Sequence, residues 1–258
     1  MTGTGVDVLL LDLGGVCVLS PVELHRRAEE GLGLEPGTLG WMGPLDPDGD
    51  ELWQRMIVGD GLTERDYWHR RSAEIGQLAG RELPLRDYMA IIYTPPSDAM
   101  IRPEAITVAR AARAAGFGVS ALTNDLRAFH GPEWHTRIPF FDLLDHLADC
   151  SDTDILKPDP RAFQRAVDIV GVAPERILLV DDQPLNISGA EAFGMQVHWF
   201  DVAEATRSWR DVADRLGLTV DLTVDHSADH SANHTVDQTV DQTVDQTVDH
   251  TADADDDA

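Results

Sequence analysis

Polar side chains that could bind a metal ion or attack a substrate directly follow three short apolar runs of the chain. They are Asp12 after the first run, Thr123 and Asn124 after the second, and Asp181 and Asp182 after the third. If the runs are parallel strands of one sheet, these residues meet at its carboxyl edge, where such sheets bind ligands. Oxygen ligands of this kind favour Mg²⁺, and a cation would relieve the repulsion between the carboxylates. An aspartate there could also act as a covalent nucleophile.

A fourth candidate is Lys157, the single lysine of a chain that has 19 arginines. It lies in the segment Leu156-Lys157-Pro158-Asp159-Pro160, before a predicted helix and ahead of the third polar strand end. The compact ammonium group of lysine suits a tight site that holds an aspartate and a phosphate, where a planar guanidinium has less room. We therefore expect Lys157 to belong to the same site.

The elements that must position these residues alternate between strand and helix. We expect strands at 6–11, 118–122, 177–180 and 196–200, and helices at 102–116, 159–171, 186–193 and 202–216. This alternation predicts an α/β protein with a doubly wound parallel sheet. Residues 20–97 carry helical signals of their own, such as Leu52, Trp53, Met56 and Ile57. They predict an inserted all-helical cap, with the α/β core formed by residues 1–19 and 98–218.

The charge of the chain excludes several classes of protein. The 258 residues have a net charge of −26, which argues against binding to nucleic acids or to anionic membranes. No apolar run approaches the ~20 residues of a membrane helix. Two cysteines, Cys17 and Cys150, are too few for a disulfide framework or a cysteine-rich zinc site. The simplest expectation is a cytoplasmic protein, and its oligomeric state stays open.

The last 40 residues differ in composition from the rest. From Thr219 onward the chain repeats tetrads such as Thr-Val-Asp-Gln, with 11 aspartates and no Lys, Arg or Glu. The 35 acidic and 20 basic residues of segment 1–218 leave that part with a net charge of −15. The repeat has almost no large apolar side chain to offset the entropy of ordering. We therefore predict a disordered, low-complexity acidic tail at 219–258.

The four motifs together resemble those of the haloacid dehalogenase (HAD) superfamily. The resemblance is carried by Asp12-Leu13-Gly14-Gly15-Val16, Leu122-Thr123-Asn124, Lys157-Pro158-Asp159-Pro160 and Leu179-Val180-Asp181-Asp182, the last followed by Asn186, Gly189, Ala190 and Gly194. They occur in the family's order, with the helical segment between the first two, and cover about residues 6–217. The chain most resembles the branch that includes the phosphatase domain of soluble epoxide hydrolases.

The resemblance implies a HAD-like Rossmannoid core and a Mg²⁺-dependent hydrolase, with a small phosphomonoester as the expected substrate. Asp12 would be the nucleophile that forms an aspartyl-phosphate, and Lys157 would neutralise charge between Asp12 and the phosphate. The phosphoryl oxygens would be bound by Thr123, with Asn124 and Gly15. The Mg²⁺ ligands would be Asp12, the Gly14 backbone carbonyl and Asp182, with Asp181 beside them.

One departure from the family pattern concerns the proton that the leaving group needs. The phosphatases usually carry a second aspartate two residues after the nucleophile, as general acid, and this chain has Gly14 there. General acid–base help contributes about 10²–10⁴-fold. Either the substrates have good leaving groups, or a cap residue such as His25 or His69 supplies the proton, or the protein is a poor phosphatase.

Two other functions stay open. A metal-independent 2-haloacid dehalogenase would use the same aspartate on carbon, but it would have no use for the pair Asp181-Asp182. A non-catalytic protein of this fold would bind a basic partner or divalent cations through the cap and the acidic tail. The joint presence of Asp12, Thr123, Lys157 and Asp182 argues against it.

Overall fold

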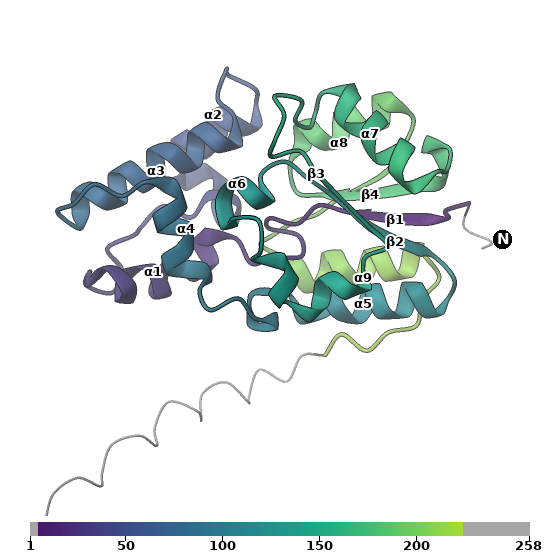
Figure 1. Cartoon of the computed structure of the whole chain (residues 1–258), viewed down its shortest axis with the longest axis horizontal. Coiled ribbons are helices and arrows are strands. Elements are labelled where there is room, and N and C mark those ends of the chain that lie inside the picture. Colours follow the sequence, from purple (N-terminus) through teal and green to yellow (C-terminus); the bar gives the residue numbers. More distant parts are fainter. Residues whose placement is uncertain (1–4, 224–258) are drawn as a thin grey trace, which may run out of the picture. The chain divides into compact units, whose positions relative to one another are not determined.

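The computed structural model describes residues 5–223, in which five parallel strands form one sheet in the order β3-β2-β1-β4-β5 (Figure 1). The strands are β1 (Val8–Leu11), β2 (Gly118–Thr123), β3 (His146–Asp149), β4 (Ile177–Asp181) and β5 (Gln196–Trp199). Strand β1 is central, because Leu9 aligns with Val119 of β2 on one side and with Leu178 of β4 on the other. The predicted doubly wound α/β fold is confirmed.

Alternate residues of the central strands pack into two separate cores, one on each face of the sheet. In β1, Leu9 and Leu11 belong to the core under α5 (Pro103–Ala114) and α9 (Ala205–Arg215). Val8 and Leu10 belong to the core under α7 (Pro160–Val170) and α8 (Pro184–Phe193). Figure 1 shows the two helix pairs on opposite faces of the sheet. Burial on both faces explains why these strands are continuous apolar runs rather than alternating ones.

The four predicted strands are present within two residues of their expected bounds, but the edge strand β3 was not predicted. Its sequence is His-Leu-Ala-Asp, and its first residue is exposed. Only the pairing of Ser120 to Thr123 with β3 makes this segment a strand, and that partner is distant in sequence. No local apolar pattern marks it.

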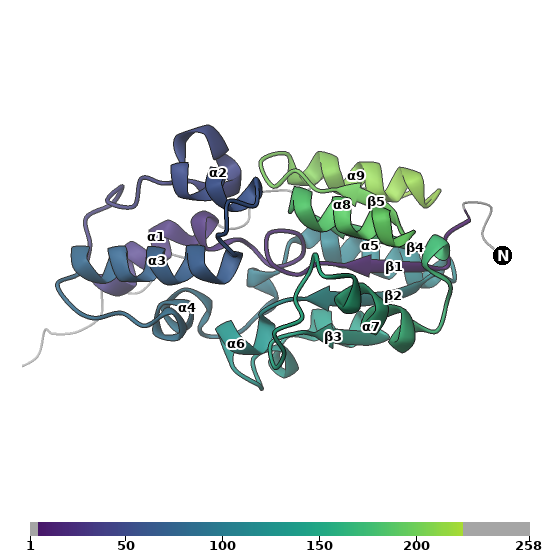
Figure 2. The same cartoon turned by 90° about the horizontal axis from the view of Figure 1, so that it is seen from above.

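Of the five α-helices between β1 and β2, the first four lie beyond the carboxyl edge of the sheet (Figure 2). They are α1 (His25–Leu32), α2 (Glu51–Ile57), α3 (Glu64–Leu78) and α4 (Leu85–Tyr93). A short helix, α6 (Leu126–His130), follows β2 and lies against α4. Short 3₁₀ helices occupy Pro21–Leu24, Gly43–Leu45, Pro47–Gly49, Asp98–Met100, His135–Arg137, Pro139–Leu143 and Pro174–Arg176. The segment is helical as expected, and its bounds as a separate domain, 20–97, stay a prediction.

The start of α3 has a specific local cause. The Thr63 hydroxyl accepts a hydrogen bond from the Asp66 backbone N–H at 3.1 Å, and the Asp66 carboxylate accepts one from the Thr63 N–H at 3.0 Å. This reciprocal capping box fixes where the helix begins. It places Glu64 and Arg65 in the first turn, at the end of α3 that faces the sheet (Figure 2).

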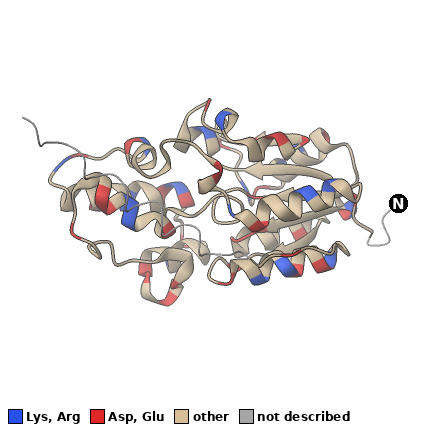
Figure 3. Ribbon diagram, turned by 90° about the horizontal axis from the view of Figure 1, so that it is seen from below, with Lys and Arg blue, Asp and Glu red and all other residues tan. Residues whose placement is uncertain are grey.

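Acidic and basic residues are interspersed along the helices (Figure 3). Within residues 5–223, no helix has the length and apolar character needed to cross a membrane. Residues 219–223 have no regular secondary structure, and Leu222 packs into the main core. The rest of the predicted tail, 224–258, lies outside the described residues.

Candidate active site

Lys157 joins two strand ends at the carboxyl edge of the sheet. Its Nζ donates hydrogen bonds to Asp12 Oδ1 at 2.8 Å and to Asp181 Oδ2 at 2.6 Å. The lysine side chain is 1% exposed. Burial works against its charge, but the carboxylates of Asp12 and Asp181 outweigh burial and raise the pKa of Lys157 above its ordinary value. The lysine is therefore a fixed positive charge beside Asp12.

Asp181 is fully engaged within the protein. Its Oδ1 accepts from the Gln183 backbone N–H at 2.9 Å and from Asn186 Nδ2 at 3.0 Å, while its Oδ2 accepts from Lys157. Asn186 belongs to the first turn of α8, directly after β4. This arrangement holds Asp181 as the partner of Lys157 and leaves Asp182 as the freer carboxylate of the pair.

The carboxylates of Asp12, Asp181 and Asp182 each place an oxygen within 4.8 Å of the others, so the three could hold a metal ion. Burial, together with the negative charge of Asp181, raises the pKa of Asp12 to about 6, against the opposing effect of Lys157. Burial and the neighbouring carboxylates raise the pKa of Asp182 well above its ordinary value. A divalent cation would relieve this repulsion, and the oxygen donors are of the type that Mg²⁺ prefers.

Gly15 makes room for Asp182. A Cβ atom at position 15 would lie 2.9 Å from Asp182 Oδ2, and the backbone φ of +75° also favours glycine. The backbone polar groups of Gly15 are both used within the protein. Its N–H donates to the Val18 carbonyl at 2.9 Å, and its carbonyl accepts from Arg102 Nε at 3.0 Å. Gly15 lines the pocket, but its backbone N–H is already used and is not a free hydrogen-bond donor. Its contribution is the space that it leaves for the Asp182 side chain.

Thr123 and Asn124 lie where β2 ends, facing the same pocket. Thr123 is buried at the last position of the strand. The Asn124 side chain forms two hydrogen bonds with the backbone of Lys157: its Oδ1 accepts from the N–H at 2.8 Å and its Nδ2 donates to the carbonyl at 3.2 Å. The amide of Asn124 therefore positions the lysine loop, a role that the sequence did not reveal.

One pocket is lined by these site residues apart from Asp181, and its lining combines polar and apolar groups. The charged and polar part includes Asp12, Gly14, Thr123, Lys157 and Asp182. Another part of the lining is largely apolar and aromatic. It is formed by Val18, Pro21, Trp53, Trp68, Met89, Tyr93, Leu126, Phe129 and His130. Among the described residues that line the pocket, Lys157 is the only lysine, and there is no arginine.

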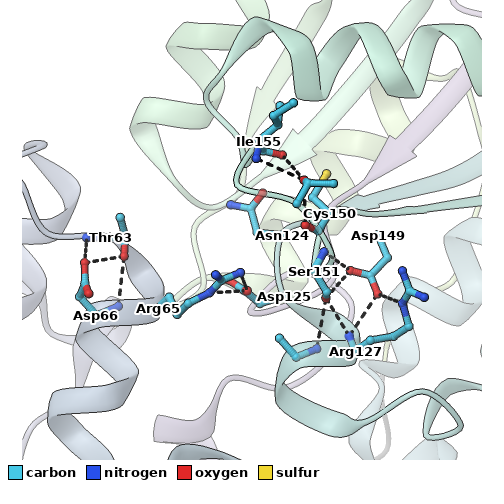
Figure 4. A network of polar contacts seen from close by, with 12 residues as sticks. Thr63, Arg65, Asp66, Asn124, Asp125, Arg127, Asp149, Cys150, Ser151 and Ile155 are labelled. Carbon is cyan, nitrogen blue, oxygen red and sulfur yellow. Dashed lines mark hydrogen bonds and ion pairs between the residues drawn. The ribbon is translucent and has the colours of Figure 1, made fainter.

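The first turn of α3 carries two further charged residues, Glu64 and Arg65, of which Glu64 lines the pocket. The Trp68 indole N–H donates to Glu64 Oε1 at 3.2 Å. Arg65 forms an ion pair with Asp125, which follows Asn124, with its Nε 2.9 Å from Asp125 Oδ1 (Figure 4). Neither Glu64 nor Arg65 was among the predicted site residues. The capping box Thr63-Asp66 is the signal that could have placed them at a helix start.

The histidines expected as proton donors are not at the pocket. His25 is buried and packs edge-on against Trp41, with ring centroids 4.3 Å apart. His69 is exposed on α3, and neither histidine is among the described residues that line the pocket. Cys17 and Cys150 are both buried free thiols.

Comparisons with known proteins agree with this fold. A family model for haloacid dehalogenase-like hydrolases matches residues 6–194. A protein named phosphatase MT3486, from Mycobacterium tuberculosis, is 31% identical over 184 residues, which are 70% of this chain and 79% of the relative. A phosphoserine phosphatase from Thermus thermophilus is 31% identical over 227 residues, 76% of this chain and 89% of the relative.

Solved structures with low sequence identity share the fold. An L-2-haloacid dehalogenase from Xanthobacter autotrophicus has a TM-score of 0.51 at 15% identity and covers 76% of this chain and 77% of its own. The protein YfnB from Bacillus subtilis, bound to magnesium, has a TM-score of 0.58 at 15% identity. The match covers 76% of this chain and 86% of YfnB. The narrower resemblance to the phosphatase domain of soluble epoxide hydrolases stays a prediction.

Proposed function

Because the chain belongs to the haloacid dehalogenase-like hydrolase family, we propose that it is a Mg²⁺-dependent phosphatase that acts on phosphomonoesters through Asp12. The observation that carries this proposal is the buried Lys157 ammonium, 2.8 Å from the carboxylate of Asp12. A positive charge held there stabilises negative charge where a phosphoryl group meets the nucleophile. The two curated relatives described above carry phosphatase names, which supports the same activity.

Each remaining polar group of the pocket has a role in this proposal. Asp12 attacks phosphorus and forms the aspartyl-phosphate, and Thr123 hydrogen-bonds the phosphoryl oxygens. Asp181 and Asn124 act through Lys157, since one accepts from its ammonium and the other holds its backbone. Gly15 leaves room beside the phosphoryl group for Asp182.

The donor set also fits a divalent cation. Asp12, Asp182 and the Gly14 carbonyl would hold Mg²⁺, which would neutralise negative charge on the phosphoryl oxygens. Asp181 would contribute its negative charge without being a main ligand of the ion. Its oxygens already accept hydrogen bonds from Lys157, Asn186 and the Gln183 N–H.

The apolar part of the pocket suggests the kind of alcohol that leaves. Of the described residues that line the pocket, only Lys157 is a lysine or an arginine. Its ammonium group is already paired with two aspartates. Burial lowers the pKa of His130 to about 3, so this histidine is neutral near pH 7. A second negative charge on the substrate would therefore find no partner there. We expect esters of uncharged apolar alcohols to be better substrates than phosphoserine.

The test is phosphate release from a panel of phosphomonoesters, with and without Mg²⁺, by wild type and by Asp12→Asn. The proposal expects turnover that needs Mg²⁺ and is lost in the variant, since the amide is no longer a nucleophile. Wild type that releases no phosphate from any ester would overturn it. Metal-free halide release from a 2-haloacid by the same protein would then identify the dehalogenase alternative.

A further inference from the structure

The pocket has an open position where the family's phosphatases usually carry their general acid. That position is Gly14. A Cβ atom built there meets no other heavy atom within 4 Å, and the residue is not among the glycines with positive φ. A proton for the leaving alcohol must therefore come from elsewhere in the pocket. This inference rests on the proposed phosphatase function.

Most of the other side chains that line the pocket are unsuited to donate that proton. Asp125 is ion-paired with Arg65, and the Tyr93 hydroxyl already donates to the Leu19 carbonyl. The His130 ring, with its lowered pKa, carries no spare proton near pH 7, and it stacks on Trp134 at a centroid distance of 4.2 Å.

Glu64 differs from these groups in both position and environment. It reaches the pocket from α3, opposite the sheet edge that carries Asp12, and it is half-buried. Burial and the negative charges of Asp12 and Asp125 raise the pKa of Glu64 to about 8, against the opposing effect of the Trp68 hydrogen bond. The charged side chains that face it are Asp12, Asp125, Asp182 and Lys157.

We propose that Glu64 is the catalytic acid of this enzyme and takes the place of the aspartate that Gly14 replaces. In the first step Asp12 attacks phosphorus, the phosphorus–oxygen bond of the ester breaks, and the Glu64 proton passes to the departing oxygen. In the second step a water molecule attacks the phosphoryl group and its proton goes to solvent, from which the Glu64 carboxylate is protonated again. The products are the alcohol and inorganic phosphate, and both carboxyl groups return to their starting states.

Two contacts hold Glu64 in place for this role. The Trp68 indole, one helical turn further along α3, fixes one carboxyl oxygen. The neighbouring Arg65 ties the first turn of α3 to Asp125 at the end of β2 (Figure 4). The proposed acid, Glu64, thus lies on a helix of the inserted segment, whereas the nucleophile, Asp12, lies at the end of a strand of the sheet.

The test compares two esters at saturating Mg²⁺. The leaving group of 4-nitrophenyl phosphate needs no proton, whereas that of 2-phenylethyl phosphate does. Glu64→Gln is expected to slow kcat on the alkyl ester about 10²–10³-fold and on the nitrophenyl ester less than about threefold. Glu51→Gln is the matched control, because Glu51 is also the first residue of its helix but is exposed, and both rates should stay unchanged.

A rescue variant separates the missing acid from a disturbed pocket. Gly14→Asp, added to Glu64→Gln, supplies a carboxyl group at the open position and should restore the alkyl-ester rate at least about tenfold. A double variant no faster than Glu64→Gln contradicts the assignment. Equal slowing of both esters by Glu64→Gln, or no slowing of the alkyl ester, also overturns it.

A failure of the proposed phosphatase function is distinguishable from a failure of the Glu64 assignment. In the first case the wild-type protein would release phosphate from neither ester. A second readout does not depend on turnover. Carbon-13 NMR of the glutamate carboxyl groups should show one resonance that titrates near pH 8 in wild type and is absent from Glu64→Gln. A wild-type spectrum without such a resonance overturns the role of Glu64.

Discussion

Gly15 shows how the absence of a side chain can shape the proposed metal site. Gly15→Ala places a methyl group 2.9 Å from Asp182 Oδ2 and also strains a backbone with φ of +75°. The control is Gly171→Ala, at φ +73°, where a Cβ meets nothing within 4 Å. Both variants should lose about 1 kcal/mol of unfolding free energy from the backbone. Only Gly15→Ala should weaken Mg²⁺ binding, by about tenfold for a lost ~1.4 kcal/mol.

Calorimetric Mg²⁺ titration and urea unfolding of the two variants check this prediction. Equal Mg²⁺ affinity in Gly15→Ala and Gly171→Ala would show that Asp182 does not need the space beside Gly15.

His130 makes the stability of the protein depend on pH. Burial lowers its pKa from 6.5 to about 3, and its Nδ1 is buried without a hydrogen-bond partner among the described residues. The unfolded chain therefore binds more protons than the folded one below pH 6.5, so acidification favours unfolding. Between pH 7 and pH 5, His130→Phe should lose about 2 kcal/mol less unfolding free energy than wild type.

Urea unfolding at the two pH values measures this difference, with the exposed His69→Phe as control. His25, whose pKa burial lowers to about 4, keeps part of the pH dependence in every variant. A His130→Phe protein with the same pH dependence as wild type would contradict the prediction.

At the scale of elements, one ion pair links the helical segment to the sheet. Arg65 and Asp125 have side-chain exposures of 32% and 6%, so solvent screens their interaction only in part. A double-mutant cycle of Arg65→Met and Asp125→Asn should give a coupling free energy of about 1–2 kcal/mol in urea unfolding. The same cycle on the exposed pair Arg26–Glu30 should give less than about 0.5 kcal/mol. Equal couplings would mean that the Arg65–Asp125 pair is no more than a surface contact.

The elements also show what could be read from the sequence. Asp12, Thr123 and Asp182 were predicted to share one site because each follows a buried strand, and Lys157 because it is the single lysine of the chain and precedes a helix. These signals are local. Strand β3 was missed because its hydrogen bonds to β2, rather than its own residues, define it. Glu64 was missed for a similar reason, since nothing in its local sequence says that α3 points its first turn at the sheet.

At the scale of the whole chain, the described unit ends with Leu222, which is 6% exposed in the main core. A chain that stops after Thr223 should keep its kcat/KM and its Tm within about 2 °C, because every site residue lies between positions 12 and 186. A chain that stops after Gly217 loses Leu222 as well as Leu218 and Val220. It should lose about 2–3 kcal/mol of unfolding free energy.

Thermal unfolding and ester turnover of the two truncated chains test this prediction. A large loss of activity in the longer one would assign a role to the acidic repeat that the described residues do not reveal.

The place of β1 at the centre of the sheet has a consequence for how the protein is made. A ribosome delivers β1 first, but its two neighbours follow much later, β2 from residue 118 and β4 from residue 177. The intervening helices emerge before any sheet exists on which they can pack. Long loops must close before native strand pairs form, which slows folding. A nascent chain shorter than about 180 residues therefore holds Asp12 without Lys157 and Asp181 both in place, and the proposed active site can assemble only after β4 has been made.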